Sequence, residues 1–184
     1  MDGLTGRLLV ATPVLVDPHF HRTVVVILDH DDDGTLGVII NRSTDRALGS
    51  VLPVWHSHAS VPEVIFEGGP VAADSAVALA ALSGAEEEPP GWRRVSGRLG
   101  LVDLDTPPML LADQLEGLRV FAGYAGWSPG QLADEIAEGA WWVVPAEPGD
   151  IFTPAPKRLW RQVLRRQPGP LRLVSTYPED PTLN

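Results

Sequence analysis

The segment from Gly126 to Gly130 reads GWSPG, which matches the G-x-S-x-G pattern of hydrolases that carry a nucleophilic serine on a sharp turn. In that turn the backbone N–H of the residue after the serine helps to form the oxyanion hole. Here that residue is Pro129, which has no N–H. In α/β-hydrolases the catalytic histidine also follows the serine, whereas all five histidines of this chain precede Ser128. The S-x-x-Q spacing to Gln131 instead predicts that Ser128 caps a helix whose first residue is Pro129.

Two glycine-containing turns are stronger candidates for a binding site. A capping box does not require the glycines at positions 123, 126 and 130, so they indicate a tight turn or the close approach of another group to the backbone. The second turn, Glu67–Pro70, reads EGGP but matches neither the Walker A pattern nor G-x-G-x-x-G. We predict that both turns converge on one cleft containing Tyr124 and Trp127, with Arg22 as a further candidate.

The candidate metal ligands do not form a complete set. The segment Asp29–Gly34 matches the first half of an EF-hand loop, but the twelfth position, which should supply a bidentate glutamate, is Ile40. We therefore expect an exposed acidic turn, with weak adventitious cation binding as the alternative. Two H-x-H pairs lack a third ligand at a recognisable spacing: His19 with His21, and His56 with His58. The chain has no cysteine, and we predict neither a metal nor a cofactor.

The charge balance disfavours a polyanionic partner. The chain has 14 basic and 24 acidic residues among 184, a net charge of −10. Its N-terminus lacks a basic region, and Pro13 breaks the first apolar run, so we predict a cytoplasmic protein without a membrane segment. Six of the 14 basic residues lie between Lys157 and Arg172. We interpret them as the polar face of an amphipathic helix, and direct nucleic-acid binding is the less favoured alternative.

The elements that must position these residues are mostly short strands. Apolar and β-branched runs predict strands over 7–15, 23–29, 35–41, 64–69, 97–105, 118–125 and 141–144, and an Asp-Gly hairpin joins the second to the third. Helical patterns cover 108–118, 129–138 and 157–167, whereas 72–82 suits either a helix or a strand. A block of strands with helices inserted late predicts the α+β class, in one domain over residues 1–184.

Several of these motifs, in this order, resemble one known family. The matching pieces are GRLLVATPVLVDPHFHRTVVVILDHDDDGTLGVIINR, FEGGPV, GYAGWSPGQLADEIAEGAWWV and LWRQVL, and the likeness covers nearly the whole chain. The chain is similar to the YqgE/AlgH family of bacterial cytoplasmic proteins. The resemblance implies a bifurcated β-sheet that closes into a pseudo-barrel with helices packed outside, and it carries no established reaction. Some members are described as regulators of exopolysaccharide gene transcription, but no DNA-binding motif supports that description. The family's signature positions are here Arg22, His30, Gly37, Asn41, Gly68, Gly69, Pro70, Tyr124, Gly126, Trp127, Gly130 and Gln131.

These observations favour a non-enzymatic regulatory protein that binds a small ligand or a protein partner, as a monomer or weak dimer. The expected ligand-binding residues are Arg22, His30, Asn41, Glu67, Gly68, Gly69, Tyr124, Gly126 and Trp127. The alternative is a hydrolase or transferase that uses His30, Asn41 and Glu67, for which titratable groups must meet around a pocket.

Overall fold

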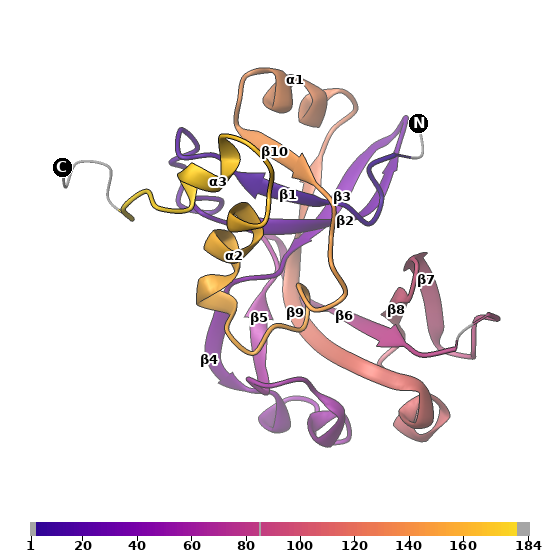
Figure 1. The fold of residues 1–184 in the computed structure, drawn as a ribbon. Helices are drawn as coiled ribbons and strands as arrows, with labels where there is room; N and C mark the ends of the chain where they lie inside the picture. Colours follow the sequence, from indigo (N-terminus) through magenta and orange to yellow (C-terminus); the bar gives the residue numbers. More distant parts are fainter. Residues whose placement is uncertain (1–2, 85, 180–184) are drawn as a thin grey trace.

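The computed structural model describes residues 3–84 and 86–179, which form a curled, mostly antiparallel sheet with few helices (Figure 1). The strands are β1 (Leu8–Ala11), β2 (Val24–Asp31), β3 (Gly34–Ile39), β4 (Ser43–Ala47), β5 (Val64–Glu67), β6 (Val71–Leu82), β7 (Trp92–Ser96), β8 (Leu99–Val102), β9 (Leu115–Trp127) and β10 (Trp141–Val144). The helices are α1 (Gln131–Ala137), α2 (Leu159–Arg165) and α3 (Leu171–Val174). The strand order is β10-β1-β2-β3-β9-β6-β8-β7.

The sheet forks at β9, its longest strand. One edge of β9 pairs with β6 from Leu115 to Tyr124. The other edge pairs with β3 through Ala125–Trp127 and, in parallel, with β5 through Phe121 and Ala122. This branch curls the sheet into a half-barrel and confirms the bifurcated α+β architecture that the family resemblance implies.

The central strands are apolar on both faces because each face is covered. In β1, Leu8 and Val10 belong to the cluster that contains Trp160 of α2. The alternate residues Leu9 and Ala11 belong to a cluster that contains Leu132 of α1. A third cluster, around Trp55, contains residues of β6, β8 and β9. This two-sided burial explains the uninterrupted apolar run of β2.

The structure confirms all the predicted strands and resolves the ambiguous segment 72–82 as part of β6. The predicted helix over 108–118 is wrong. This segment forms two 3-10 turns, η3 (Pro108–Leu110) and η4 (Ala112–Gln114), and enters β9 at Leu115. From Leu115 onward the chain pairs with β6, and this pairing overrides the local helical pattern. The exposed polar strand β4 and the edge strand β7 had no clear apolar alternation and were not predicted.

The predicted helix over 129–138 exists, but it begins at Gln131, and Ser128 is not its cap. The residue before the helix is Gly130, whose left-handed backbone (φ 80°) redirects the chain, and it makes no side-chain capping bond. The Ser128 backbone N–H and Oγ instead donate to Oε1 of Gln131, at 3.0 and 3.2 Å. The predicted helix over 157–167 is observed as a 3-10 turn (η5, Pro156–Arg158) followed by α2. No helix in the described part of the chain is long and apolar enough to cross a membrane.

Candidate functional site

The two glycine turns meet through their backbones, as predicted. The N–H of Gly68 donates to the carbonyl of Ala122 at 2.8 Å. A Cβ at Gly69 would lie 2.2 Å from the carbonyl oxygen of Tyr124, and a Cβ at Gly123 would lie 2.4 Å from the carbonyl oxygen of Gly69. These glycines are therefore required by the close approach of two chain segments, independently of any ligand.

A shallow hollow of about 420 Å³ lies on β9 beside this contact. Tyr124, Gly126 and Trp127 line it, together with the acidic residues of the β2–β3 turn. A Cβ at Gly126 would meet only the Tyr124 ring, at 3.9 Å, so packing does not require glycine there. Oδ1 of Asp31 accepts the backbone N–H of Asp33 at 2.8 Å, which supports an exposed acidic turn. Residues 3–84 and 86–179 contain no group of three or more acidic or histidine side chains that could hold a metal ion.

His30 and Trp127 have structural partners near the hollow. Nδ1 of His30 is hydrogen-bonded to Oγ1 of Thr35 at 2.6 Å. Nε1 of Trp127 donates to Oε2 of Glu135 at 2.9 Å, and the same oxygen accepts from Nε1 of Trp141 at 2.9 Å. Trp127 thereby attaches α1 to the sheet.

Arg22 and Asn41 lie at the opposite end of the β2–β3 hairpin. Oδ1 of Asn41 accepts the N–H of Val24, and Nδ2 of Asn41 donates to the carbonyl of Arg22, both at 2.9 Å. This clamp holds Arg22 in a left-handed backbone conformation (φ 54°) that costs a non-glycine residue about 1 kcal/mol or more. The hollow beside Tyr124 does not include Arg22, contrary to the expected single cleft.

The Arg22 side chain lines a second pocket, of about 390 Å³. Its guanidinium carbon lies 4.3 Å from the centre of the Trp160 ring, and Nη2 donates to the carbonyl of Tyr177 at 2.5 Å. Residues 175–179 are here called the C-terminal segment, and its last four residues line the pocket together with Trp160. Arg161 Nη1 donates to the carbonyl of Ser175 in the same segment. Burial and the nearby Arg161 lower the pKa of Arg22, whereas Glu179 acts in the opposite direction.

The structure does not assemble the proposed catalytic group. His30 pairs with Thr35 at one end of β3, and Asn41 lies six residues beyond Thr35, about 20 Å along an extended chain. Both Oδ1 and Nδ2 of Asn41 form hydrogen bonds with the backbone. Glu67 is exposed, and its own N–H donates to the carbonyl of Arg42.

Two further arginines, not selected from the sequence, hold residues 145–153, here called the β10–α2 segment. Arg119 is 1% exposed and donates to the carbonyls of Val61, Ile151 and Thr153 at 2.6, 3.0 and 2.9 Å. Burial lowers its pKa to about 10. The feature of the sequence that could have indicated this buried role is a charged residue inside the apolar run of β9.

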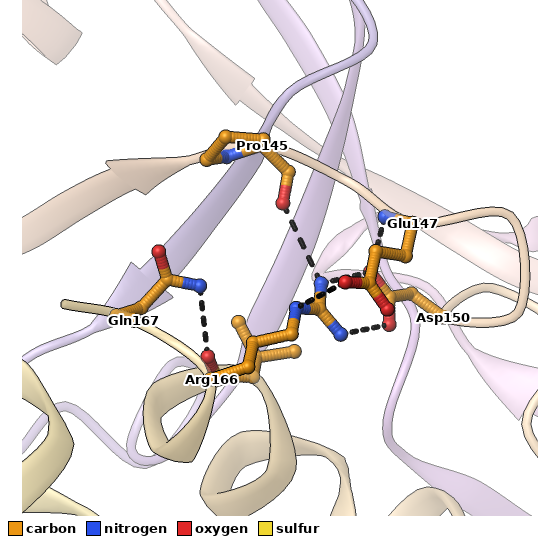
Figure 2. A network of polar contacts seen from close by, with 6 residues as sticks. Pro145, Glu147, Asp150, Arg166 and Gln167 are labelled. Atoms are coloured by element: carbon orange, nitrogen blue, oxygen red, sulfur yellow. Dashed lines mark hydrogen bonds and ion pairs between the residues drawn. The ribbon is translucent and has the colours of Figure 1, made fainter.

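Arg166 holds the same segment from the end of α2 (Figure 2). Nη1 and Nη2 of Arg166 donate to the two carboxylate oxygens of Asp150 at 2.7 and 2.5 Å. Nε of Arg166 lies 3.4 Å from Oε1 of Glu147. The hydrogen bonds to Asp150 raise the pKa of Arg166. The segment lines a groove of about 710 Å³ together with Leu99 and Glu116.

The protein is thus a curled, forked sheet with α1 packed against one face and α2 against the other. Comparisons with known proteins identify the family that has this fold. The AlgH-like family model matches residues 8–172, so the chain belongs to the YqgE/AlgH family. A UPF0301 protein of Streptomyces coelicolor is 58% identical over 100% of this chain and 97% of its own length. A UPF0301 protein of Mycobacterium tuberculosis is 48% identical over 97% of this chain and 90% of its own.

Two solved structures share the fold. The crystal structure of protein DIP2367 from Corynebacterium diphtheriae has a TM-score of 0.90 and 36% identity, and the match covers 95% of this chain and 92% of that one. The solution structure of AlgH from Pseudomonas aeruginosa has a TM-score of 0.70 and 29% identity, with coverage of 94% and 93%. Family membership carries no established activity, so a function must rest on the geometry of the site.

Proposed function

We propose that the chain is a cytoplasmic, non-enzymatic binding protein whose ligand site is the pocket around Arg22. The single observation that carries this proposal is the clamp by Asn41, which keeps Arg22 in a strained backbone conformation with its guanidinium over Trp160. Strained backbone of this kind is concentrated at sites where a side chain must be presented to a ligand. A guanidinium beside an aromatic ring provides both polar donors and an apolar surface for a small molecule.

Binding is favoured over catalysis because the two titratable candidates, His30 and Glu67, are separated along β9. His30 pairs with Thr35, which lies opposite Trp127, whereas Glu67 lies opposite Ala122, about 17 Å away along the strand. The Asn41 amide is used to hold the backbone. A catalytic acid–base pair needs two groups within hydrogen-bond reach of one reacting atom.

A regulatory role fits this proposal through binding of a ligand rather than direct contact with DNA. Two cations of the basic helical region are engaged within the chain, Arg161 with the C-terminal segment and Arg166 with Asp150. The net charge of −10 also opposes a nucleic-acid surface.

Native mass spectrometry of the protein purified from its own host tests the proposal. We expect a small-molecule adduct on the unaltered chain that is lost in Arg22→Gln and kept in Arg46→Gln, a matched change on the exposed strand β4. An adduct that survives Arg22→Gln would place the ligand elsewhere. Absence of any adduct from the unaltered chain would count against a tightly held ligand.

A further inference from the structure

Two guanidinium groups face the C-terminal segment and donate to it only through backbone carbonyls. Arg22 donates to the carbonyl of Tyr177, and Arg161 donates to that of Ser175. A guanidinium has five N–H donors, so most of the donors of both groups have no protein acceptor among the described residues. Neither arginine has a carboxylate within 4.0 Å among residues 3–84 and 86–179. Within the described part of the chain, neither arginine of the pair therefore forms an ion pair.

The charge of Arg161 acts on Arg22, although Arg161 is not among the residues that line the pocket. Burial lowers the pKa of Arg22 most, and the positive charge of Arg161 lowers it further. Glu179 lines the same pocket as Arg22, and its negative charge raises the pKa of Arg22. The chain thus places one of its own carboxylates in the pocket of a guanidinium that has no ion pair among the described residues.

Two other residues that line the pocket, Trp160 and Arg22, are held in place by the rest of the fold. Trp160 is 3% exposed, and its Nε1 donates to the carbonyl of Ala11 at 2.9 Å. Asn41 fixes the backbone of Arg22. Donors held in place before binding lose little conformational entropy when a ligand arrives. The C-terminal segment, in contrast, is exposed from Thr176 to Glu179.

We propose that Arg22 and Arg161 together bind the carboxylate or phosphate group of an anionic ligand, and that Glu179 is the competing carboxylate of the chain itself. Guanidinium groups recognise both anions through paired N–H···O bonds. The inference rests on the proposed function and names the chemical class that its pocket accepts. A free carboxylic acid and a phosphate ester share this chemistry.

Titration of the ¹⁵N-labelled protein with inorganic phosphate, and separately with acetate, tests the inference by NMR. We expect saturable shifts of the Arg22 and Arg161 Nε–H signals and of the backbone amides of residues 175–179. The anion that binds more tightly indicates whether the natural ligand is a carboxylic acid or a phosphate ester. Arg22→Gln and Arg161→Gln should each weaken binding at least about tenfold, because each removes a charged donor. Glu179→Gln should tighten it roughly two- to fivefold by removing the competing charge.

Matched controls separate the pocket from general charge effects. Arg46→Gln removes one positive charge, as Arg22→Gln and Arg161→Gln do, and Glu87→Gln removes one negative charge, as Glu179→Gln does. Both lie at exposed positions outside the pocket, and we expect unchanged affinity. Because Arg22→Gln changes a strained position, Arg161→Gln and Glu179→Gln keep the test valid if the Arg22 variant does not fold. Shifts that are absent, that persist in Arg161→Gln, or that do not respond to Glu179→Gln would overturn the anion assignment.

The outcomes for the two proposals are distinguishable. If neither anion binds while the host adduct is still lost in Arg22→Gln, the binding function stands and the anion class is rejected. If the anions bind through both arginines but no host adduct is found, the anion site stands and a tightly held natural ligand is rejected.

Discussion

Arginine pairs hold two segments of this molecule, and the pairs differ in how firmly they do so. The β10–α2 segment, residues 145–153, is held by the buried Arg119 and by Arg166, which pairs with the carboxylate of Asp150 (Figure 2). The C-terminal segment, residues 175–179, is held by Arg22 and Arg161 through single backbone carbonyls. The same residue type therefore serves as an internal support in one place, whereas in the other each guanidinium makes one hydrogen bond among the described residues.

The difference follows from burial and from the acceptors. Arg119 donates to the buried carbonyls of Ile151 and Thr153 and, in a part-buried contact, to that of Val61, while its Nε has no partner among the described residues. Its guanidinium carbon also lies 4.2 Å from the centre of the Phe66 ring. Breaking such contacts leaves buried carbonyls without a donor, whereas water can replace the partner of an exposed carbonyl. We therefore expect changes in the β10–α2 segment to affect folding and changes in the C-terminal segment to affect binding.

Arg119→Leu should have the largest effect on stability. It removes the donors to Val61, Ile151 and Thr153 from a buried position, and we expect the free energy of unfolding to fall by roughly 3 kcal/mol. Urea unfolding followed by circular dichroism measures this. Arg98→Leu, which breaks an exposed ion pair with Glu116, is the control and should cost less than about 1 kcal/mol. Equal losses in both variants would refute the supporting role of Arg119.

Asp150→Asn should have an intermediate effect. The Asp150 side chain is 6% exposed and accepts both guanidinium nitrogens of Arg166, so removing its charge should cost about 2 kcal/mol in the same unfolding measurement. Glu147→Gln is the matched control, because Glu147 is 64% exposed and lies 3.4 Å from Arg166. We expect it to cost less than about 0.5 kcal/mol. A larger loss in Glu147→Gln than in Asp150→Asn would reverse our ranking of the two carboxylates.

Ending the chain at Thr176 should have the smallest effect on stability. The exposed contact between Arg22 and Tyr177 is lost, and we expect the free energy of unfolding to change by less than about 0.5 kcal/mol. A chain ended at Glu179 keeps that contact and serves as the reference. A loss near that of Asp150→Asn would show that the two arginine-held segments are alike, and the comparison would fail.

Local sequence signals predicted the sheet better than the site. The Asp-Gly turn and the β-branched run of β2 predicted the hairpin because both act over a few residues. The helix over 108–118 was a wrong prediction because the strand partner of β9 is β6, more than 30 residues away in sequence. The contact between the glycine turns was predicted, but the position of Arg22 was not. Its neighbour Tyr177 is 155 residues away, and no local pattern indicates that approach.

The branch at β9 links the stability of both arms of the fork. β9 pairs with β3 on one arm and with β6 on the other, so neither arm has its full set of strand partners without it. A shift of its register by one residue would exchange the faces of Phe121 and Ala122 and disturb the packing on both arms at once. The two arms are therefore expected to melt in a single cooperative transition, with β9 among the last amides to exchange with solvent.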